Sequence, residues 1–201
     1  MSDDPIATRE LGSELLGLAN DQGFPAYITT ATIITGWAIG RCADVHAGIA
    51  QLQRGLNMIG KGSMRYFMSC QLCLLTQLYL QSGDIDSAMS TLGEAGDLVK
   101  RSDETLWEAE IHRLTGDALC AADKVSFQAA QAEYERALDV SRRTGAKSLE
   151  LRATMGLARL WDGQGRREEA RESLQSMYEW FTEGFETPDL KAASSLLSEL
   201  A

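Results

Sequence analysis

The sequence is poor in proline, and its three prolines fall near the ends of the segments that read as helices. Pro5, Pro25 and Pro188 leave every proposed helix interior intact, so long uninterrupted helices are allowed throughout. Basic residues are also outnumbered, because 19 lysines and arginines face 29 acids and give a formal net charge of −10. This balance argues against direct binding to nucleic acid or anionic lipid, whereas a basic partner is compatible with it.

The sequence also lacks the apolar stretches that export or membrane insertion needs. The first ten residues, MSDDPIATRE, are acidic, so we expect no export, a cytoplasmic location and four reduced cysteines. The longest uncharged run, Gln22–Gly40, has 19 residues, which is just long enough to span a bilayer. Gly23 and Pro25 place its start in a turn, so the continuous helix is too short and we predict no membrane segment. Its GxxxG then serves close packing inside a helix buried on both sides.

No catalytic or metal-binding motif stands out, and two near misses are better explained by structure. The segment Gly55–Ser63 resembles a phosphate-binding loop, but Gly62 occupies the hydroxyl position and a helix precedes the loop. We therefore predict that Gly60 and Gly62 end a helix. Cys70 and Cys73 form a CxxC on one helical face, yet neither a second ligand pair nor a helix N-terminus accompanies them. We expect packed thiols, no cofactor and no enzyme activity; a thiol or metal enzyme is the third hypothesis for function.

What the sequence does contain is a repeating helical hairpin, clearest over Leu151–Phe181. Gly163 and Gly165 separate two amphipathic helices, in which small residues at Ala158 and Ala170 allow close backbone approach. The large apolar residues at helical spacing are Leu151, Met155, Leu157, Trp161, Leu174, Met177, Tyr178 and Phe181. Such a hairpin cannot bury its own apolar faces, so it predicts copies of itself and matches the tetratricopeptide-type signature.

Small and large residues of the second helix return along the chain at nearly constant intervals. The pairs are Gly48 with Leu52, Ala88 with Leu92, Ala130 with Tyr134, and Ala170 with Leu174, in steps of 40, 42 and 40 residues. First-helix pairs recur in the same way, as Gly36 with Ile39, Leu75 with Tyr79, and Gly116 with Leu119. This period exceeds the roughly 34 residues of the standard repeat, so we expect helices longer by about one turn each.

The predicted fold is therefore all-α, a right-handed superhelix of about four tetratricopeptide-like hairpins with a C-terminal capping helix. We predict one helical-repeat domain over residues 1–201. Its parts are a half-hairpin at 4–22, repeats at 24–62, 63–103, 104–145 and 146–184, and a capping helix at 187–200. Asp84 is the expected cap of one second helix, and Thr187 with Pro188 and Asp189 the expected start of the last. The half-hairpin suggests that the chain begins in the middle of an array.

First helices of such arrays line the concave surface, and their residues not needed for packing should project into a groove. In the first two repeats these residues are Thr30, Trp37, Cys70, Cys73, Gln77 and Gln81. In the last two they are Glu110, Arg113, Asp117, Arg152 and Arg159. The arginines are candidates for holding a carboxylate of a peptide or ligand. The alternative is that Glu110 and Asp117 pair with them as a solvated face.

Several segments together resemble a known family. They are Leu106–Gly116, Gly145–Ala153, Leu157–Trp161, Trp180–Phe185 and Thr187–Lys191. They are similar to the C-terminal repeat region of large bacterial proteins in which a class III adenylate or guanylate cyclase domain, or a DNA-binding regulator, precedes a signalling ATPase module and such repeats. The resemblance implies a helical-repeat fold and a regulatory role. This chain has no Walker motif and no cyclase metal carboxylates, so neither ATP binding nor cyclase activity carries over.

Two main hypotheses for function follow. In the first, a protein partner, or another domain of a parent protein, places a peptide or helix in the groove. In the second, the groove senses a small molecule and controls an upstream ATPase or cyclase. Homodimer formation is left open by the sequence.

Overall fold

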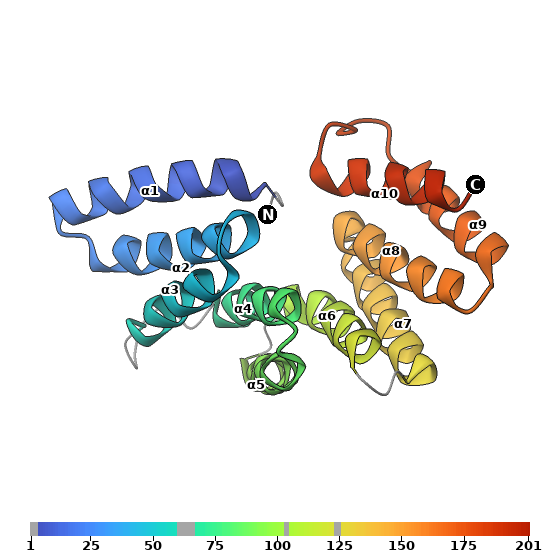
Figure 1. Cartoon of the computed structure of the whole chain (residues 1–201), viewed down its shortest axis with the longest axis horizontal. Coiled ribbons are helices and arrows are strands. Elements are labelled where there is room, and N and C mark those ends of the chain that lie inside the picture. The colour runs from blue at the N-terminus through green and yellow to red at the C-terminus, as the bar shows by residue number, and fades with distance from the viewer. Residues whose placement is uncertain (1–3, 60–66, 103–104, 123–125) are drawn as a thin grey trace. The chain divides into compact units, whose positions relative to one another are not determined.

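The computed structural model describes residues 4–59, 67–102, 105–122 and 126–201, and within these ranges all regular structure is helical (Figure 1). The helices are α1 (Pro5–Gln22), α2 (Pro25–Cys42), α3 (Val45–Asn57), α4 (Met68–Ser82), α5 (Ile85–Ser102), α6 (Glu108–Ala121), α7 (Phe127–Thr144), α8 (Lys147–Gly163), α9 (Arg167–Tyr178) and α10 (Pro188–Glu199). A short 3-10 helix, η2 (Thr105–Trp107), precedes α6. No helix of the described chain is long and apolar enough to cross a membrane.

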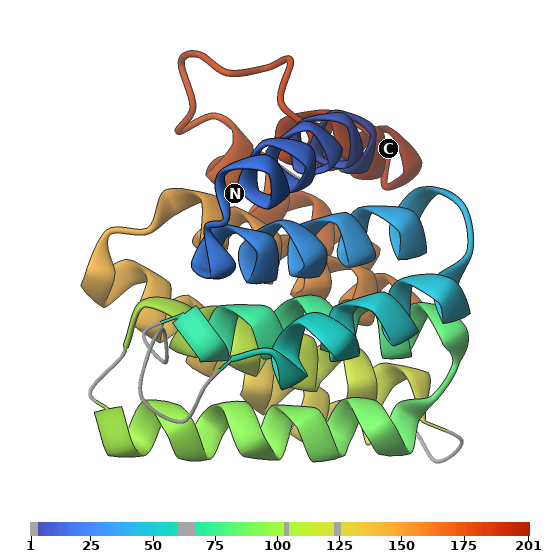
Figure 2. The ribbon, with the colours of Figure 1, turned by 90° about the vertical axis from the view of Figure 1, so that its left-hand side faces the viewer.

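The chain divides into two compact units, each a stack of helices with its own core. The N-terminal unit is Asp4–Glu104 with α1 to α5, and the C-terminal unit covers Thr105–Ala201 with α6 to α10. In the N-terminal unit, α1 packs along α2, α2 along α3, and α4 along α5, as the side view in Figure 2 shows.

The recurrent small and large residues of the sequence occupy the packing surfaces. Leu52, Leu92, Tyr134 and Leu174 are all buried, and so are the small residues four positions before them. The repeated pairs are thus confirmed as the sites where each second helix packs on its neighbours. The all-α prediction is confirmed as well.

Glycines allow the closest approach, between α2 and α3. A Cβ built on Gly48 would lie 2.4 Å from the Cα of Gly40, and one on Gly36 would lie 2.6 Å from the backbone nitrogen of Leu52. Trp37, Leu52 and Leu78 are fully buried beside this contact. The GxxxG of the uncharged run is therefore a packing element inside a buried helix, as predicted.

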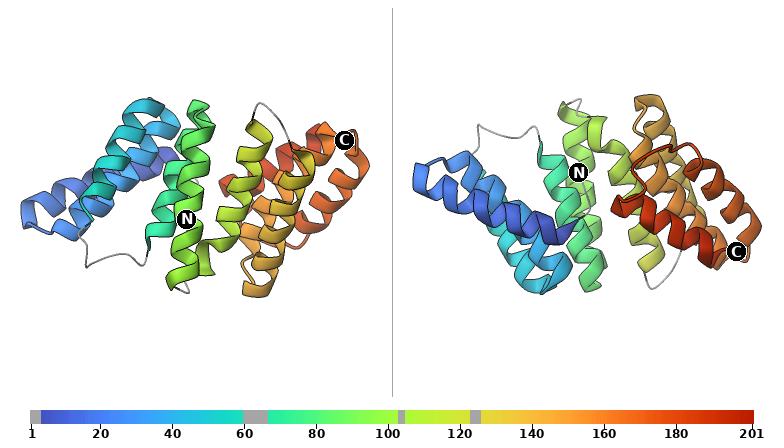
Figure 3. Two further views of the ribbon diagram at one scale, coloured as in Figure 1. Left: turned by 90° about the horizontal axis from the view of Figure 1, so that it is seen from below. Right: turned by 90° about the horizontal axis from the view of Figure 1, so that it is seen from above.

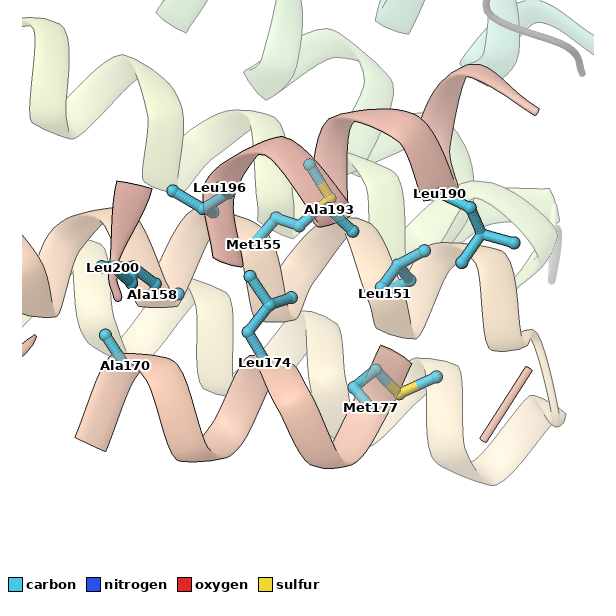
Figure 4. Packing of buried hydrophobic residues seen from close by; sticks show 10 residues of the cluster. All are labelled: Leu151, Met155, Ala158, Ala170, Leu174, Met177, Leu190, Ala193, Leu196 and Leu200. Carbon is cyan, nitrogen blue, oxygen red and sulfur yellow. The ribbon is translucent and has the colours of Figure 1, made fainter. Parts of the chain in front are cut away.

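In the C-terminal unit, α10 closes the hairpin of α8 and α9. Ten residues form one cluster, seen in Figure 4: Leu151, Met155, Ala158, Ala170, Leu174, Met177, Leu190, Ala193, Leu196 and Leu200. The view from above in Figure 3 shows α10 lying across this hairpin. A second cluster, around Tyr134, joins α7 to α8.

Helix ends follow the expected signals with some differences. Asp84 accepts a hydrogen bond of 3.0 Å from the Ser87 amide, so its predicted cap is confirmed. Thr187 is the N-cap residue of α10, but its side chain makes no capping bond. Helix α9 ends at Tyr178, whereas the apolar spacing predicted a helix to Phe181. The predicted helix stop at Gly60 and Gly62 lies outside the described residues.

Candidate functional site

Three of the predicted groove residues come together in the N-terminal unit. The Trp37 indole donates a hydrogen bond of 2.8 Å to Gln77 Oε1. Gln81 donates from Nε2 to the Gly40 carbonyl at 2.9 Å, and Arg41 donates to Gln81 Oε1 at 3.3 Å. The residues in each pair stand 40 or 41 positions apart. The repeat period therefore appears directly as hydrogen bonds that fix the register of α2 against α4.

The prediction that Trp37 projects out of the packing surface is wrong, because only 2% of it is exposed. Cys70 and Cys73 are buried too, rather than facing a groove. These residues lie on α2 and α4, which are covered on more than one side, so helical periodicity underestimates how much of their surface is packed. Gln77 is half-buried and Gln81 is exposed.

Four other predicted residues form a charge network in the C-terminal unit. Arg113 on α6 donates to both Glu110 carboxylate oxygens, at 2.8 and 2.7 Å, and to Asp117 at 2.5 Å. Arg152 on α8 donates from Nε to both oxygens of Asp189 on α10, at 3.0 and 2.9 Å. Arg152 Nη1 also lies 3.8 Å from Glu110. The network therefore ties together α6, α8 and α10.

Burial makes these contacts strong. Glu110 is 1% exposed, and the Arg113 side chain 15%. Burial alone would lower the pKa of Arg113, but the Glu110 and Asp117 carboxylates raise it well above the usual value, so the guanidinium stays charged. Tyr134 donates to Asp117 at 2.7 Å, and burial together with that carboxylate raises the pKa of Tyr134. The same burial raises the pKa of the neighbouring Cys120 thiol.

The network pairs two of the predicted groove arginines, Arg113 and Arg152, with carboxylates of their own unit. Glu110 and Asp117 do pair with Arg113, as the alternative held, yet the face is largely buried rather than solvated. The expectation that Glu110 projects freely is wrong, because its carboxylate lies inside the unit. Arg159 is exposed and stands apart from this network. Whether these residues bind a partner stays a prediction.

A pocket of about 650 Å³ opens beside the Arg152–Asp189 pair. Its volume falls within the 300–1,000 Å³ typical of ligand sites. The residues that line it belong to η2, the first half of α8, the segment after α9 and the start of α10: Leu106, Trp107, Ser148, Leu149, Leu151, Arg152, Phe181, Glu183, Gly184, Thr187, Pro188, Asp189 and Leu190. Leu151 and Leu190 are almost inaccessible, so they are the part of this lining that belongs to the core.

The segment between α9 and α10 owes its shape to aromatic packing and one glycine. Tyr178 and Phe185 rings lie 5.7 Å apart, and Trp180 and Phe181 meet edge to face at 5.1 Å. The Lys147 ammonium sits 5.1 Å from the Trp180 ring centre, which joins this segment to α8. Gly184 has a φ of 78°, a conformation that side chains disfavour. The pocket wall is thus held in place without regular helix.

Two polar features of the pocket bear on what it could hold. The Trp107 Nε1 donor is buried and has no hydrogen-bond partner within the described structure. Arg152 and Asp189 neutralise each other, which leaves Glu183 as the remaining charge of the lining. The Trp107 donor is itself inaccessible, so the lining suits a ligand with an apolar body.

The thiols offer little chemistry. Cys70 and Cys73 are buried in the core, Cys120 is half-buried, and Cys42 is exposed. Within the described residues, no group of three or more histidine, cysteine, aspartate or glutamate side chains is placed to hold a metal ion. The Nδ1 atom of His112 on α6 lies 2.6 Å from Oε2 of Glu133 on α7.

The sequence pattern did not predict the pocket, because part of its lining lies outside the α-helices. Leu106 and Phe181 precede or follow a helix, and Glu183 and Gly184 lie in the connection to α10. The family resemblance did indicate this part of the chain, because four of the five segments that carry it contribute residues to the pocket lining.

Comparison with known proteins supports the fold. No family model and no curated protein matches the sequence. Among solved structures the chain is similar to RapI, a tetratricopeptide-like helical-repeat protein described in its apo form, with a TM-score of 0.65 at 12% sequence identity. The match covers 86% of this chain and 62% of the RapI chain, so the chain spans less than two thirds of that structure. At this identity the similarity establishes the helical-repeat fold.

Proposed function

We propose that this chain is a non-catalytic interaction module that binds a peptide segment of a protein partner. The observation that supports this proposal most directly is the 650 Å³ pocket of the C-terminal unit. This pocket would bind a large apolar side chain of the peptide. The pocket replaces the concave groove of the first-helix residues as the centre of the proposal, because Trp37 and Glu110 are buried.

Exposed apolar residues around the pocket favour a macromolecular partner. Leu106 is 61% exposed and Trp180 56%, and Phe185 in the same segment is exposed as well. Aromatic side chains in such positions are the residues that most often carry binding energy in protein interfaces. A peptide would cover this apolar rim as well as fill the pocket.

The test is selection of binding peptides from a displayed random library on the whole chain. We expect enriched peptides to carry tryptophan, phenylalanine or leucine, and Leu106→Glu to weaken their binding roughly tenfold or more, since it introduces a charge at the pocket. Phe127→Glu is the matched control, because Phe127 is an exposed apolar residue of the same unit that does not line the pocket. Equal weakening by both variants, or no enrichment, contradicts the proposal.

A small-molecule sensor is the second candidate function, favoured by the volume of the pocket, about 650 Å³, which lies in the range of ligand sites. A metabolite with an apolar body would fill the pocket. A thermal-shift screen separates the two candidates, because a small molecule that binds the folded form raises the melting temperature. Loss of that rise in Leu106→Glu, which places a charge at the pocket, would identify the site.

The family resemblance supports a regulatory setting for either candidate. In this proposal the chain is a repeat region that biases an ATPase module or a cyclase or DNA-binding output domain of one bacterial signalling protein, in the cytoplasm. Reading the neighbouring coding sequence tests it. An ATPase or cyclase module upstream in the same frame is the expected result, and an unrelated upstream gene contradicts it.

A further inference from the structure

A second surface of the molecule, far from the pocket in sequence, carries an exposed apolar ridge. Helix α1 packs on α2 through Gly12 and Ala19, both buried. Leu11 and Leu18 stand outside this contact and are 66% and 61% exposed. They are seven residues apart, two helical turns, so they project from nearly the same line along α1. We call these two leucines the α1 ridge.

Acidic residues accompany the α1 ridge along one side. Glu14 and Asp21 follow the two leucines by three residues each, and Glu10 lies one turn before Glu14, so all three fall on the adjacent line of the helix. All three are exposed. Arg9, the one basic residue of α1, falls on the opposite side of the helix from the ridge at 100° per residue.

We infer that the α1 ridge docks a basic amphipathic helix of a partner protein. Apolar residues at heptad spacing match the seam of a two-helix contact, and charges flanking such a seam select the partner. A flank of three carboxylates attracts lysine and arginine on the incoming helix. The formal charge of −10 on the whole chain also attracts a basic helix over a longer range.

The charge pattern also argues against a second copy of this chain as the occupant. In a two-fold antiparallel pair of α1 helices, the same flank of each helix meets itself. Glu10, Glu14 and Asp21 would then face the identical carboxylates of the copy, and like charges at such positions are repulsive. A helix bearing the opposite charge meets no such penalty.

The test uses a synthetic helical peptide with leucine at heptad positions a and d and lysine at e and g, labelled for fluorescence anisotropy. We expect the whole chain to bind it, with an affinity that falls as salt rises. The same peptide with glutamate at e and g should not bind. The double variant Leu11→Ala/Leu18→Ala should bind the lysine peptide roughly tenfold more weakly or worse, because it removes the apolar ridge.

A matched control is Met89→Ala, which removes an exposed apolar side chain of α5 in the same unit. It should leave peptide affinity unchanged. Charge removal by Glu14→Gln/Asp21→Asn should reduce both the affinity and its salt dependence, while circular dichroism confirms the fold. Equal binding by wild type and the leucine variant, or binding of the glutamate peptide, overturns the inference. Self-association of the wild type that the leucine variant abolishes, measured by sedimentation velocity, would assign the ridge to a second copy instead.

Discussion

At the residue scale, the most consequential contact is the buried pairing of Arg113 with Glu110. The two lie on consecutive turns of α6, and the carboxylate is held by two hydrogen bonds inside the unit. Breaking such a pair from one side leaves an uncompensated buried charge, which costs far more than the loss of an exposed pair.

We predict that Arg113→Met lowers the free energy of unfolding by about 3 kcal/mol, because it removes the two hydrogen bonds, of 2.8 and 2.7 Å, that Arg113 donates to the buried Glu110 carboxylate. The control is Arg136→Met, which removes an ion pair with Glu133 whose arginine is 59% exposed and should cost under about 1 kcal/mol. Urea denaturation measures both. Equal losses would show that burial does not strengthen the network. Because Arg113 and Arg152 support the fold, their substitution is a poor probe of ligand binding.

Glu150 gives a pH-dependent counterpart on α8. Burial alone would raise the pKa of this carboxyl, but hydrogen bonds from Lys147 and Arg142, at 2.7 and 3.0 Å, lower it below its ordinary value. A lowered folded-state pKa means stability that is present above the unfolded pKa and lost as pH falls through the folded pKa.

We predict that Glu150→Gln destabilises the protein at pH 7 by about 1–2 kcal/mol, the usual worth of charged hydrogen bonds. The difference from wild type should shrink as the pH falls below the ordinary carboxyl range, where the wild-type carboxylate also becomes protonated. Glu168→Gln, which alters an exposed pair with Arg171, should change stability little at any pH. Denaturation midpoints across pH check both. A constant difference at all pH values would contradict the assignment.

At the scale of elements, backbone contact between α2 and α3 is the tightest feature of the N-terminal unit. The Gly48 position leaves no room for a methyl group, since the added carbon would lie 2.4 Å from backbone atoms of Gly40. Neither atom belongs to a side chain that could rotate away, so the helices themselves must separate.

Gly48→Ala is therefore expected to lower the free energy of unfolding by about 3 kcal/mol, despite the better helix propensity of alanine. Gly93→Ala makes the identical change in α5, where the glycine is exposed and nothing lies within 4 Å of the added carbon. That variant should gain up to about 1 kcal/mol. The opposite signs are checked by thermal unfolding. A stabilised Gly48→Ala would mean that the helices are not in backbone contact.

At the scale of the whole molecule, periodicity predicted which helices exist and which residues hold them together. The recurrence from Gly48 to Ala170 located four packing sites, because small-beside-large patterns survive in any helix that touches two neighbours. Polar residues on packed faces could not be placed in this way. The Trp37 indole donates a hydrogen bond to Gln77 one repeat later, and the Glu110 carboxylate accepts one from Arg113 of its own helix. Because these polar groups have partners, both side chains can be buried.

The pocket escaped prediction for a different reason. Its wall after α9 is shaped by aromatic contacts and by a glycine with positive φ, and neither leaves a periodic signal. The apolar spacing even predicted a helix through Phe181, where the chain has already left α9. Tertiary packing of a few aromatic rings overrides local spacing there.

Each unit has its own core, and this separation predicts how the protein responds to a destabilising substitution. Leu52 belongs to a cluster of α2, α3 and α4, and Leu174 to the cluster of α8, α9 and α10. Truncation of either leucine to alanine removes buried contacts worth about 2–5 kcal/mol. In repeat architectures, stability is approximately a sum of local terms and of contacts between neighbouring repeats. Each substitution should therefore destabilise mainly the unit in which it lies.

Hydrogen exchange measured by mass spectrometry tests this. Leu52→Ala should speed amide exchange in α2 to α4 while α8 to α10 keep the wild-type rates, and Leu174→Ala should do the reverse. Leu18→Ala, which truncates an exposed leucine, is the control and should change exchange in neither core. If either core variant accelerated exchange equally in both units, the chain would unfold as one cooperative body, and stability could not be assigned to separate cores.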